Sequence, residues 1–539
     1  MPNKLLNGLP VTSRVPTSSS GKSTVRKIRI RPVDGGLNVS KTGELIDVKQ
    51  SPAMRDVYFF RNEMRKAHSS TQLGADLDNS VVNVSLWKKL DGIIYPVAIT
   101  TRDFYYYQNA IWNKVSPAGS LSGTANNYIT AAAFNDTFYF VSFDFELRSW
   151  IGPSNSHAAV AGGFSAKGMD IINNRIVLAH IIDNGVARAQ TIKWTQNGSA
   201  SFTGTGSGTR DLADRPDTIQ NIRKLGPYRG LVYKEDRIVD MRSTGDASFP
   251  FDTTELVGGL GLLCPYSLAE WAGGHFFVSN DESIFAFDGS KFDDIGIDIR
   301  DEFFNNLNPN YYDIVIGFFN SRTSEYIVII PVGSQSGASP SLYYAYDTRK
   351  KRWRSGIYSG LTAFSTYASS SGISWDEDIG TWDSATDTWN DLTGITTRRR
   401  TLVGTSSKRV LILDEGAPYS FDGSALQFSY QIGDIVGEND GDEITLLEVI
   451  IGYIVDGAAT LLVDATIDQG NTFVGETAAT LGGSGLKAGD IHYARASLIV
   501  TGDNIRIRVR NSIATETIRI VSITPNISYS QSSRSESKQ

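Results

Sequence analysis

The sequence is poor in the residues that build covalent and metal cross-links. Its 539 residues include one cysteine, Cys264, and five histidines. A single cysteine excludes an intrachain disulfide, which argues against a disulfide-stapled secreted protein. The histidines lie far apart and form no His-x-x-x-His pair, so no metal site is expected. No apolar run approaches about eighteen residues, so we expect no transmembrane helix and no membrane insertion by this chain.

Sequence motifs of catalysis are also missing. There is no Gly-x-Ser-x-Gly elbow, no Walker A loop and no EF-hand loop. Acidic residues are plentiful, but no spacing singles out the carboxylate pair that a glycosidase needs. Cys264 lies in the apolar stretch "GLLCPYS" and is expected to be a buried core residue rather than a nucleophile. We therefore expect neither an enzyme nor a bound cofactor.

An excess of positive charge is lacking as well. The formal net charge is −7, which gives the whole chain no signature of a protein that wraps nucleic acid. Residues 1–31 are the exception, with seven lysines or arginines, no acid, and no apolar region of a signal peptide. We expect them to form a flexible basic arm, or an arm that docks on an acidic neighbouring subunit. Residues 531–539 are expected to be a disordered tail.

The residues that are abundant favour strands. The chain has 51 glycines and 11% aromatic residues, a composition typical of strands joined by tight turns. Helical periodicity is found only in Asp298–Asn305 and in part of Arg55–Lys66. Elsewhere short alternating or β-rich runs are bounded by Gly, Asn, Asp or Pro, which predicts an all-β chain.

Residues 87–426 repeat a loose pattern of strand, polar turn, strand and aromatic residue. The spacing of about 40 to 60 residues is that of propeller blades. Turn pairs such as Asn135-Asp136 and Asn173-Asn174 are typical of hairpins. We predict a β-propeller of about six blades, with a tandem of β-sandwiches as the competing interpretation. Residues 32–86 are expected to be a strand segment that joins the C-terminal platform.

The C-terminal region has longer and more regular strands. Residues 427–530 are predicted to form an antiparallel β-sandwich, the platform domain. The stretch "NIRIRVR" alternates isoleucine or valine with an arginine row, which places the arginines on the outer face. The row is either a solvated face or a contact to an acidic partner or DNA. A second basic run is either a solvated turn or a contact to an acidic neighbour or DNA. The arginines of these two groups are Arg506, Arg508 and Arg510, and Arg398, Arg399 and Arg400.

The stretch "TIDQGNTF" matches an Asp-box, a hairpin turn. Its aspartate can accept backbone N–H bonds, its glycine can take positive φ, and its aromatic residue is expected to pack inward. We expect a structural role, because one copy in a sandwich does not indicate a sialidase. The motif residues are Thr466, Asp468, Gly470, Thr472 and Phe473.

Three heptapeptides, each beginning Ser/Thr-Trp-Asp/Asn, fill residues 374–394 within the propeller region. Gly, Thr, Asp and Asn disfavour a helix, and a period of seven would send alternate tryptophans to opposite faces of a strand. We predict an insertion made of tight turns whose tryptophans stack as a small satellite core. A calcium site and a sugar-binding platform are the alternatives. The tryptophans are Trp375, Trp382 and Trp389.

Several stretches together resemble the tail nozzle, or tail hub, proteins of short-tailed bacteriophages, also called tail tubular protein B or packaged-DNA stabilisation proteins. The stretches are "VDGGLNVSKTGELIDVKQSPAMRDVYFFRNEMRKA", "WKKLDGIIYPVAITTRDFYYYQNAIWNKVSP", the tryptophan repeat and "ARASLIVTGDNIRIRVRNSIATETIRIVSI". The resemblance covers most of the chain, and the family has no catalytic residues to carry over.

The resemblance implies a structural virion protein, assembled in the host cytoplasm. Six copies would form a ring that continues the DNA channel below the portal and adaptor, retains the packaged genome and lets it pass at ejection. Implied partners are further copies of the chain, portal and adaptor proteins, tail fibre or spike proteins, and double-stranded DNA. Two other functions stay open: a receptor- or glycan-binding propeller of a tail, and a glycoside hydrolase on a propeller.

Overall fold

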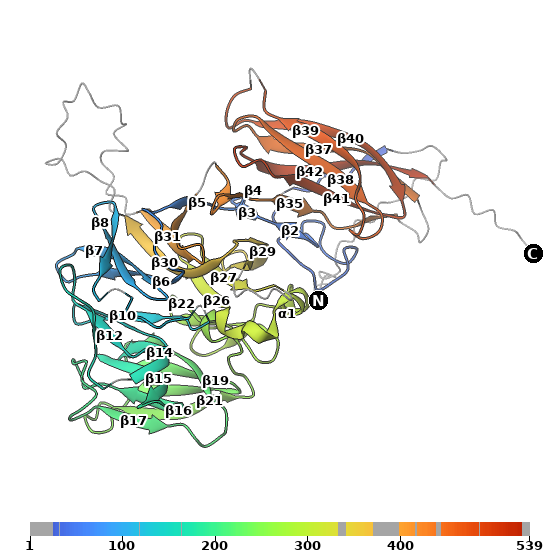
Figure 1. Cartoon of the computed structure of the whole chain (residues 1–539). Coiled ribbons are helices and arrows are strands. Elements are labelled where there is room, and N and C mark those ends of the chain that lie inside the picture. The colour runs from blue at the N-terminus through green and yellow to red at the C-terminus, as the bar shows by residue number, and fades with distance from the viewer. Residues whose placement is uncertain are drawn as a thin grey trace, which may run out of the picture.

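The chain is all-β, with a propeller and a β-sandwich (Figure 1). The computed structural model describes residues 25–31, 33–117, 119–124, 126–162, 164–332, 341–369, 398–414, 418–437, 443–483 and 486–530. Within these ranges it has seven four-stranded antiparallel sheets and two six-stranded sheets. The expected fold class is confirmed, and the propeller has one blade more than the estimate of about six.

The first four blades follow one another along the chain, each running from its innermost to its outermost strand. The first two are β6 (Val81–Lys88), β7 (Ile94–Thr100), β8 (Phe104–Gln108) and β9 (Ile111–Val115), then β10 (Thr130–Phe134), β11 (Thr137–Val141), β12 (Arg148–Trp150) and β13 (Ala158–Ala159). The next two are β14 (Phe164–Ile172), β15 (Arg175–Asp183), β16 (Val186–Trp194) and β17 (Gly208–Asp211), then β18 (Ile219–Gly226), β19 (Arg229–Lys234), β20 (Arg237–Ser243) and β21 (Phe251–Gly258).

The fifth and sixth blades continue this order, with the helical turns η1 (Pro265–Ser267), α1 (Arg300–Asn306) and η2 (Pro309–Ile314) in the connections. Their strands are β22 (Ala269–Trp271), β23 (Gly274–Val278), β24 (Ile284–Phe287) and β25 (Phe292–Asp294), then β26 (Ile316–Asn320), β27 (Glu325–Ile330), β28 (Leu342–Asp347) and β29 (Arg352–Ile357). The helix expected near Asp298–Asn305 is thus present as α1. The tight turns Asn135-Asp136 and Asn173-Asn174 have positive φ at both residues, as two-residue hairpin turns require.

The seventh blade is assembled from distant parts of the chain. Its strands are β30 (Leu361–Ser369), β31 (Arg398–Thr405), β32 (Val410–Asp414) and, as the outermost strand, β5 (Ser69–Gln72). Sequence periodicity missed this blade because residues 370–397 separate its first two strands and its last strand precedes the first blade. Since β30 packs against β6, the blade also closes the ring.

Aromatic and aliphatic side chains fill the space between successive blades. Between the first and second blades, for example, Trp87, Phe104, Phe140 and Trp150 are buried in one cluster. The cluster between the fifth and sixth blades is different, because it continues without a break into the sandwich. Cys264 lies in this cluster, buried as expected, and burial raises the pKa of its thiol well above the usual value. A neutral, covered thiol is a poor nucleophile.

The sandwich draws strands from both ends of the chain. One sheet contains β3 (Val57–Phe60), β4 (Glu63–Lys66), β42 (Arg519–Ser530), β37 (Glu443–Ile454) and β40 (Ile491–Gly502), with β1 (Val25–Lys27) beside β42. The other contains β2 (Met54–Arg55), β35 (Phe428–Gln431), β41 (Asn504–Asn511), β38 (Ala459–Thr466) and β39 (Val474–Leu481), with β36 (Ile435–Val436) beside β41. A short hairpin, β33 (Ser420–Phe421) and β34 (Ser424–Ala425), lies in the chain between the seventh blade and β35.

The helix expected within Arg55–Lys66 is wrong. Val57 and Phe59 on β3 are buried while their neighbours are half-buried, and β3 pairs with β4 as a hairpin. Burial with a period of two is that of a strand lying on a core. The segment 32–86 therefore contributes β2, β3 and β4 to the sandwich, but β5 and β6 to the propeller.

Asp56 joins the sandwich to the outer strand of the sixth blade. Its Oδ1 accepts a hydrogen bond from the Ile357 N–H at 2.8 Å and its Oδ2 accepts one from the Gln427 N–H at 2.9 Å. The Asp56 N–H in turn donates to the Ser355 carbonyl at 3.0 Å. Asp56 is 1% exposed, and burial raises the pKa of its carboxyl group.

A buried ion pair lies beside this junction. The Arg354 guanidinium donates to both carboxylate oxygens of Glu325, at 2.7 and 2.8 Å, and to the Val57 carbonyl at 3.3 Å. Arg354 and Glu325 are both almost fully buried, so neither charge has water to replace a lost partner. The pair therefore fixes the backbone of β3 to the sixth blade.

Replacing Asp56 by alanine should destabilise the protein. The part-buried N–H groups of Ile357 and Gln427 would lose their acceptor, at about 1 kcal/mol each. We expect a lower melting temperature and faster proteolysis between the propeller and the sandwich. The control is Asp47→Ala, because exposed Asp47 accepts only a local bond from the Lys49 N–H at 2.9 Å. Equal stability of Asp56→Ala and Asp47→Ala would contradict the assigned role.

His275 makes the stability of the propeller sensitive to acid. Its Nδ1 accepts from the Tyr233 hydroxyl at 2.8 Å and its Nε2 donates to the Lys224 carbonyl at 2.9 Å, so the fifth blade is bonded to the fourth through a neutral imidazole. Burial is the main cause that lowers the pKa of His275 to about 4. The folded-state pKa of His275 lies below its unfolded value of about 6.5. The contribution of His275 to the free energy of unfolding is therefore fully present above about pH 6.5 and is lost as the pH falls through about 4.

This linkage predicts a fall of about 3 kcal/mol in the free energy of unfolding between pH 7 and pH 4 from His275. The variant His275→Gln should start with a lower melting temperature at pH 7 and then lose less on acidification. Thermal unfolding followed at several pH values measures both slopes. Identical slopes for the two proteins would show that His275 carries none of the acid sensitivity.

Candidate functional site

The arginine row of β41 is paired within the chain. Arg506 binds Asp434, with Nη2 at 2.9 Å from Oδ2, and Arg508 binds Asp464, with Nη2 at 2.7 Å from Oδ2. Arg510 reaches Asp464 at 3.3 Å and also Glu476. The positive charge of the arginine row is therefore largely balanced by acidic residues of the sandwich. A contact of the row with a partner or DNA stays a prediction.

The Asp-box turn connects β38 to β39. The Thr472 N–H donates to Asp468 Oδ1 at 2.8 Å, and Gly470 has a φ of +104°. These bonds lower the pKa of Asp468 to about 2, the largest cause being the Thr466 hydroxyl. The position of Phe473 differs from the expected inward packing, since its half-buried ring lies under the Arg508 guanidinium at 3.6 Å. The turn thereby also orients one member of the arginine row.

The other sequence-predicted residues lie largely outside the described part of the chain. Trp375, Trp382 and Trp389 fall within 370–397, between β30 and β31. The run Arg398–Arg400 is not a turn, because it opens β31, where its backbone pairs with Tyr367–Ser369 of β30. Whether the tryptophan repeat forms a satellite core, a calcium site or a sugar platform stays a prediction.

Among the described residues, no group of three or more His, Cys, Asp or Glu side chains could hold a metal ion. No described helix is long and apolar enough to cross a bilayer.

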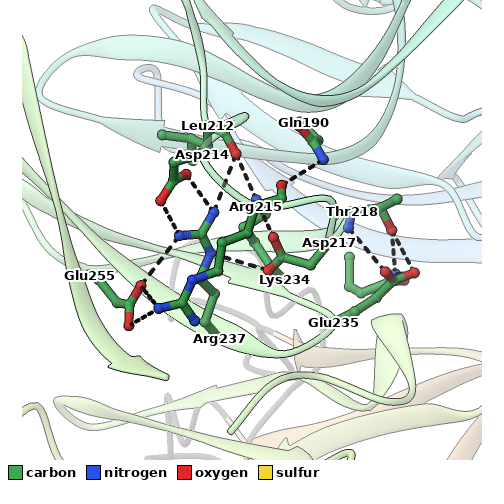
Figure 2. Close-up of polar contacts among 11 residues, drawn as sticks. Gln190, Leu212, Asp214, Arg215, Asp217, Thr218, Lys234, Glu235, Arg237 and Glu255 are labelled. Atoms are coloured by element: carbon green, nitrogen blue, oxygen red, sulfur yellow. Dashed lines mark hydrogen bonds and ion pairs between the residues drawn. The ribbon is translucent and has the colours of Figure 1, made fainter. Parts of the chain in front are cut away.

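A buried ion network lies between the third and fourth blades (Figure 2). Arg237, at the start of β20, donates through Nη2 to Asp214 at 2.6 Å and through Nε to Asp217 at 3.2 Å. Lys234, at the end of β19, contacts Asp217 at 2.8 Å and donates to the Leu212 carbonyl at 2.7 Å. Both cations are almost fully buried. Bonding to Asp214 raises the pKa of Arg237 and lowers that of Asp214.

This network fixes the connection between β17 and β18. Glu255 of β21 adds a contact to Arg237 Nη1 at 3.3 Å, and Glu235 accepts from the Thr218 N–H at 3.0 Å. Its buried charges are matched by charges or carbonyls, which is the arrangement of a structural anchor rather than of a site awaiting a ligand. Sequence reasoning missed it because its acids and bases are separated by a strand and show no motif spacing.

A face of the sandwich offers a different kind of surface. Residues of β40 alternate between buried and exposed, and three large apolar side chains are on the exposed side. Ile491, Tyr493 and Ile499 are 42%, 57% and 78% exposed. β40 is the terminal strand of its sheet order, and with exposed Arg495 and Ser497 between Tyr493 and Ile499, its outer side presents both polar and apolar groups to a neighbouring chain. We call these three residues the β40 face.

No protein-family model and no curated protein matches the chain. Solved structures similar to it include BamB from Moraxella catarrhalis, with 9% identity and a TM-score of 0.34, covering 73% of this chain and 98% of that chain. The Neurospora crassa Pan2 WD40 domain has 6% identity and a TM-score of 0.35, covering 64% and 95%. YCF48 from Cyanidioschyzon merolae has 8% identity and a TM-score of 0.29, covering 64% and 98%. These similarities are too low to support any inference about function.

Removing the central cation of the network should be costly. Arg237→Ala leaves Asp217 buried beside only one cation, and breaking a buried pair typically costs about 3–5 kcal/mol. We expect the melting temperature to fall by several degrees and proteolysis at residues 212–218 to become faster. The matched control is Arg215→Ala, because Arg215 is half-exposed and its contact to Glu255 at 3.3 Å should contribute less than about 1 kcal/mol. A similar effect of both substitutions would contradict the anchor role.

Proposed function

We propose that the protein is a structural component of the tail of a short-tailed bacteriophage. It forms a closed ring, as a nozzle or hub that continues the DNA channel below the portal and adaptor and contacts tail fibre or spike proteins. It has no enzymatic role and resides in the virion. The sequence resemblance suggests this role, and one structural observation supports it best: the propeller and the sandwich are joined by a continuous core and a buried polar junction.

Such a junction suits a ring subunit. A cyclic assembly closes only if every copy presents its two contact surfaces at the same angle. A loose hinge between two domains would spread that angle over a range. Asp56 and the Glu325–Arg354 pair hold the sixth blade against the sandwich at points that water does not reach. The chain therefore resembles one rigid body more than two linked modules.

The β40 face supplies a contact surface of the required kind. In a ring the contacts are heterologous, so one surface of each copy covers a different surface of the next. Ile499 is 78% exposed, and burying such a side chain contributes roughly 2 kcal/mol. We assign the β40 face as one side of the contact between neighbouring copies.

The charge distribution is consistent with a channel through which DNA passes. A wall that bound phosphates tightly would hold the genome back, because each phosphate contact adds to affinity. The net charge is −7, and the arginine row of β41 is matched by Asp434, Asp464 and Glu476. The second candidate function, a receptor- or glycan-binding propeller of a tail, is favoured by a polar cleft described in the next subsection.

Single-particle imaging of the purified protein, alone and mixed with portal–adaptor complexes, tests the proposed function. We expect rings with a central channel. Ile499→Glu should abolish them or weaken association at least about tenfold, since a charge would have to be buried at the contact. Val186→Glu is the control, because Val186 is a similarly exposed apolar residue (61%) on the third blade.

The possible outcomes separate the two parts of the proposal. Monomers only, with no ring on mixing with portal–adaptor complexes, would contradict the function itself. Rings formed by Ile499→Glu as readily as by the wild type would contradict the assignment of the β40 face while leaving the ring in place. Loss of rings in both variants would show that any added charge disrupts assembly.

A further inference from the structure

A polar cleft opens at one end of the third and fourth blades. It has a volume of about 700 Å³ and is lined by the β14–β15, β16–β17, β18–β19 and β20–β21 turns. In an antiparallel four-stranded sheet, the first and third turns lie at the same end, so two blades bring four turns together. The Asn173 N–H donates to the Pro227 carbonyl at 2.8 Å, and Asn173 Nδ2 donates to Ser243 Oγ at 2.8 Å. These bonds connect the two blades and hold the cleft in shape.

Arg175 lines this cleft with an unbalanced charge. Its Nη1 donates to the carbonyls of Thr195 and Gly206, at 2.7 and 2.6 Å. Its Nε is buried and has no hydrogen-bond partner, and within the described ranges no carboxylate lies within 4 Å of its guanidinium. The side chain is 3% exposed, and burial lowers its pKa. By contrast, Arg237 and Arg354 in the same propeller are paired with acids.

A buried guanidinium without a counter-ion is costly, because water no longer solvates it fully. An anion in the cleft would restore that balance, and guanidinium–carboxylate bonds are among the stronger hydrogen bonds of proteins. If its role were purely structural, Arg175 would support the β16–β17 turn through its hydrogen bonds to two backbone carbonyls. Those bonds use Nη1 alone, and because Nε is enclosed by protein, Nη2 is the nitrogen left to meet an anion in the cleft.

The remaining lining suits the hydroxyl groups and the ring of a sugar. Gln196, Asn197 and Ser243 place amide and hydroxyl groups along the walls. Tyr228, at the rim, is 67% exposed and presents an aromatic ring on which a sugar ring can pack. A mostly preformed recess with a few converging polar groups is the usual form of a small-ligand site.

We propose that this cleft binds an anionic saccharide, a sugar ring that carries a carboxylate, with the carboxylate at Arg175 and the ring against Tyr228. Asp246, also in the lining, accepts a hydrogen bond from the Ser248 N–H at 2.7 Å and is placed to accept sugar hydroxyls. It is the one carboxylate of the lining, whereas glycoside hydrolysis uses two. The site therefore binds and does not cleave. This inference does not depend on ring formation.

The first test compares two sugars that differ only in the charged group. Saturation-transfer NMR and calorimetry are carried out on the full-length protein with D-glucuronate and with D-glucose. We expect D-glucuronate to bind with a Kd on the order of 1 mM, as weak monosaccharide sites do, and D-glucose at least about tenfold more weakly. No binding of D-glucuronate, or equal binding of both sugars, would overturn the proposal.

Variants then locate the binding. Tyr228→Ala removes an exposed ring and should weaken D-glucuronate binding about tenfold without changing the melting temperature. Phe249→Ala is the matched control, because Phe249 is 75% exposed in the neighbouring β20–β21 turn and does not line the cleft. Binding that is unaffected by Tyr228→Ala, or weakened equally by both substitutions, would overturn the placement.

Arg175→Gln should abolish the preference for D-glucuronate over D-glucose. Because Arg175 also supports the β16–β17 turn, the melting temperature of this variant is measured in parallel, and Tyr228→Ala carries the test if the variant does not fold. Inorganic phosphate is the competing probe. If phosphate displaces D-glucuronate while Tyr228→Ala has no effect, the cleft is a plain anion site and the saccharide assignment is wrong.

Discussion

The buried pair of Glu325 and Arg354 is the interaction on which the arrangement of the two domains depends. The Arg354 guanidinium donates through Nε and Nη2 to Glu325 and through Nη1 to the Val57 carbonyl. It therefore contacts a strand of the blade and a strand of the sandwich at once. Asp56, the residue before Val57, continues the same connection to Ile357 and Gln427. A buried charge tolerates no partial separation of its partners. Glu325 and Arg354 both belong to the sixth blade, so the pair holds the guanidinium in place, and its bond to the Val57 carbonyl reaches the sandwich.

This junction lies where the hydrophobic core is also continuous. Other apolar clusters lie mainly between two neighbouring blades, but the cluster of the fifth and sixth blades includes Leu37 and Trp353 and continues into the sandwich. Apolar burial supplies the stabilisation there, and the polar groups fix the geometry. The Leu37 N–H donates to the Trp353 carbonyl at 2.8 Å, so even the linking backbone is bonded. A single extended body results, with surfaces at both ends available for contacts.

Strands and a helix with regularly spaced apolar residues could be predicted from the sequence. The pairing of distant strands that closes the propeller could not. The long alternating strands of residues 427–530 indicated the sandwich, and the pattern of Asp298–Asn305 indicated α1 because local spacing alone determines both. The hairpin at Val57–Lys66 was misjudged because short apolar runs do not distinguish strand from helix until a core is known. The seventh blade was missed because its outermost strand is not adjacent to it in sequence.

The candidate sites divide in the same way. The Asp-box was visible because its residues are consecutive, whereas the Arg237 network and the Arg175 cleft are assembled from several turns of two blades. No sequence pattern marks Arg175, because its distinguishing feature is that no carboxylate of the described residues pairs with its guanidinium. Such an absence becomes visible only when distances are known.

The origin of the outermost strand of the seventh blade has a consequence for biosynthesis. β5 leaves the ribosome before every strand of the propeller, yet its partner β32 is among the last to be made, with Gln72 opposite Leu411. Until then β5 has no sheet to join, and the first blade has no neighbour on one side. Contacts between such distant residues form slowly, because a long loop must be closed first. The propeller therefore stays an open arc until β32 has been made, and its ring closes only after the strands of all seven blades are available.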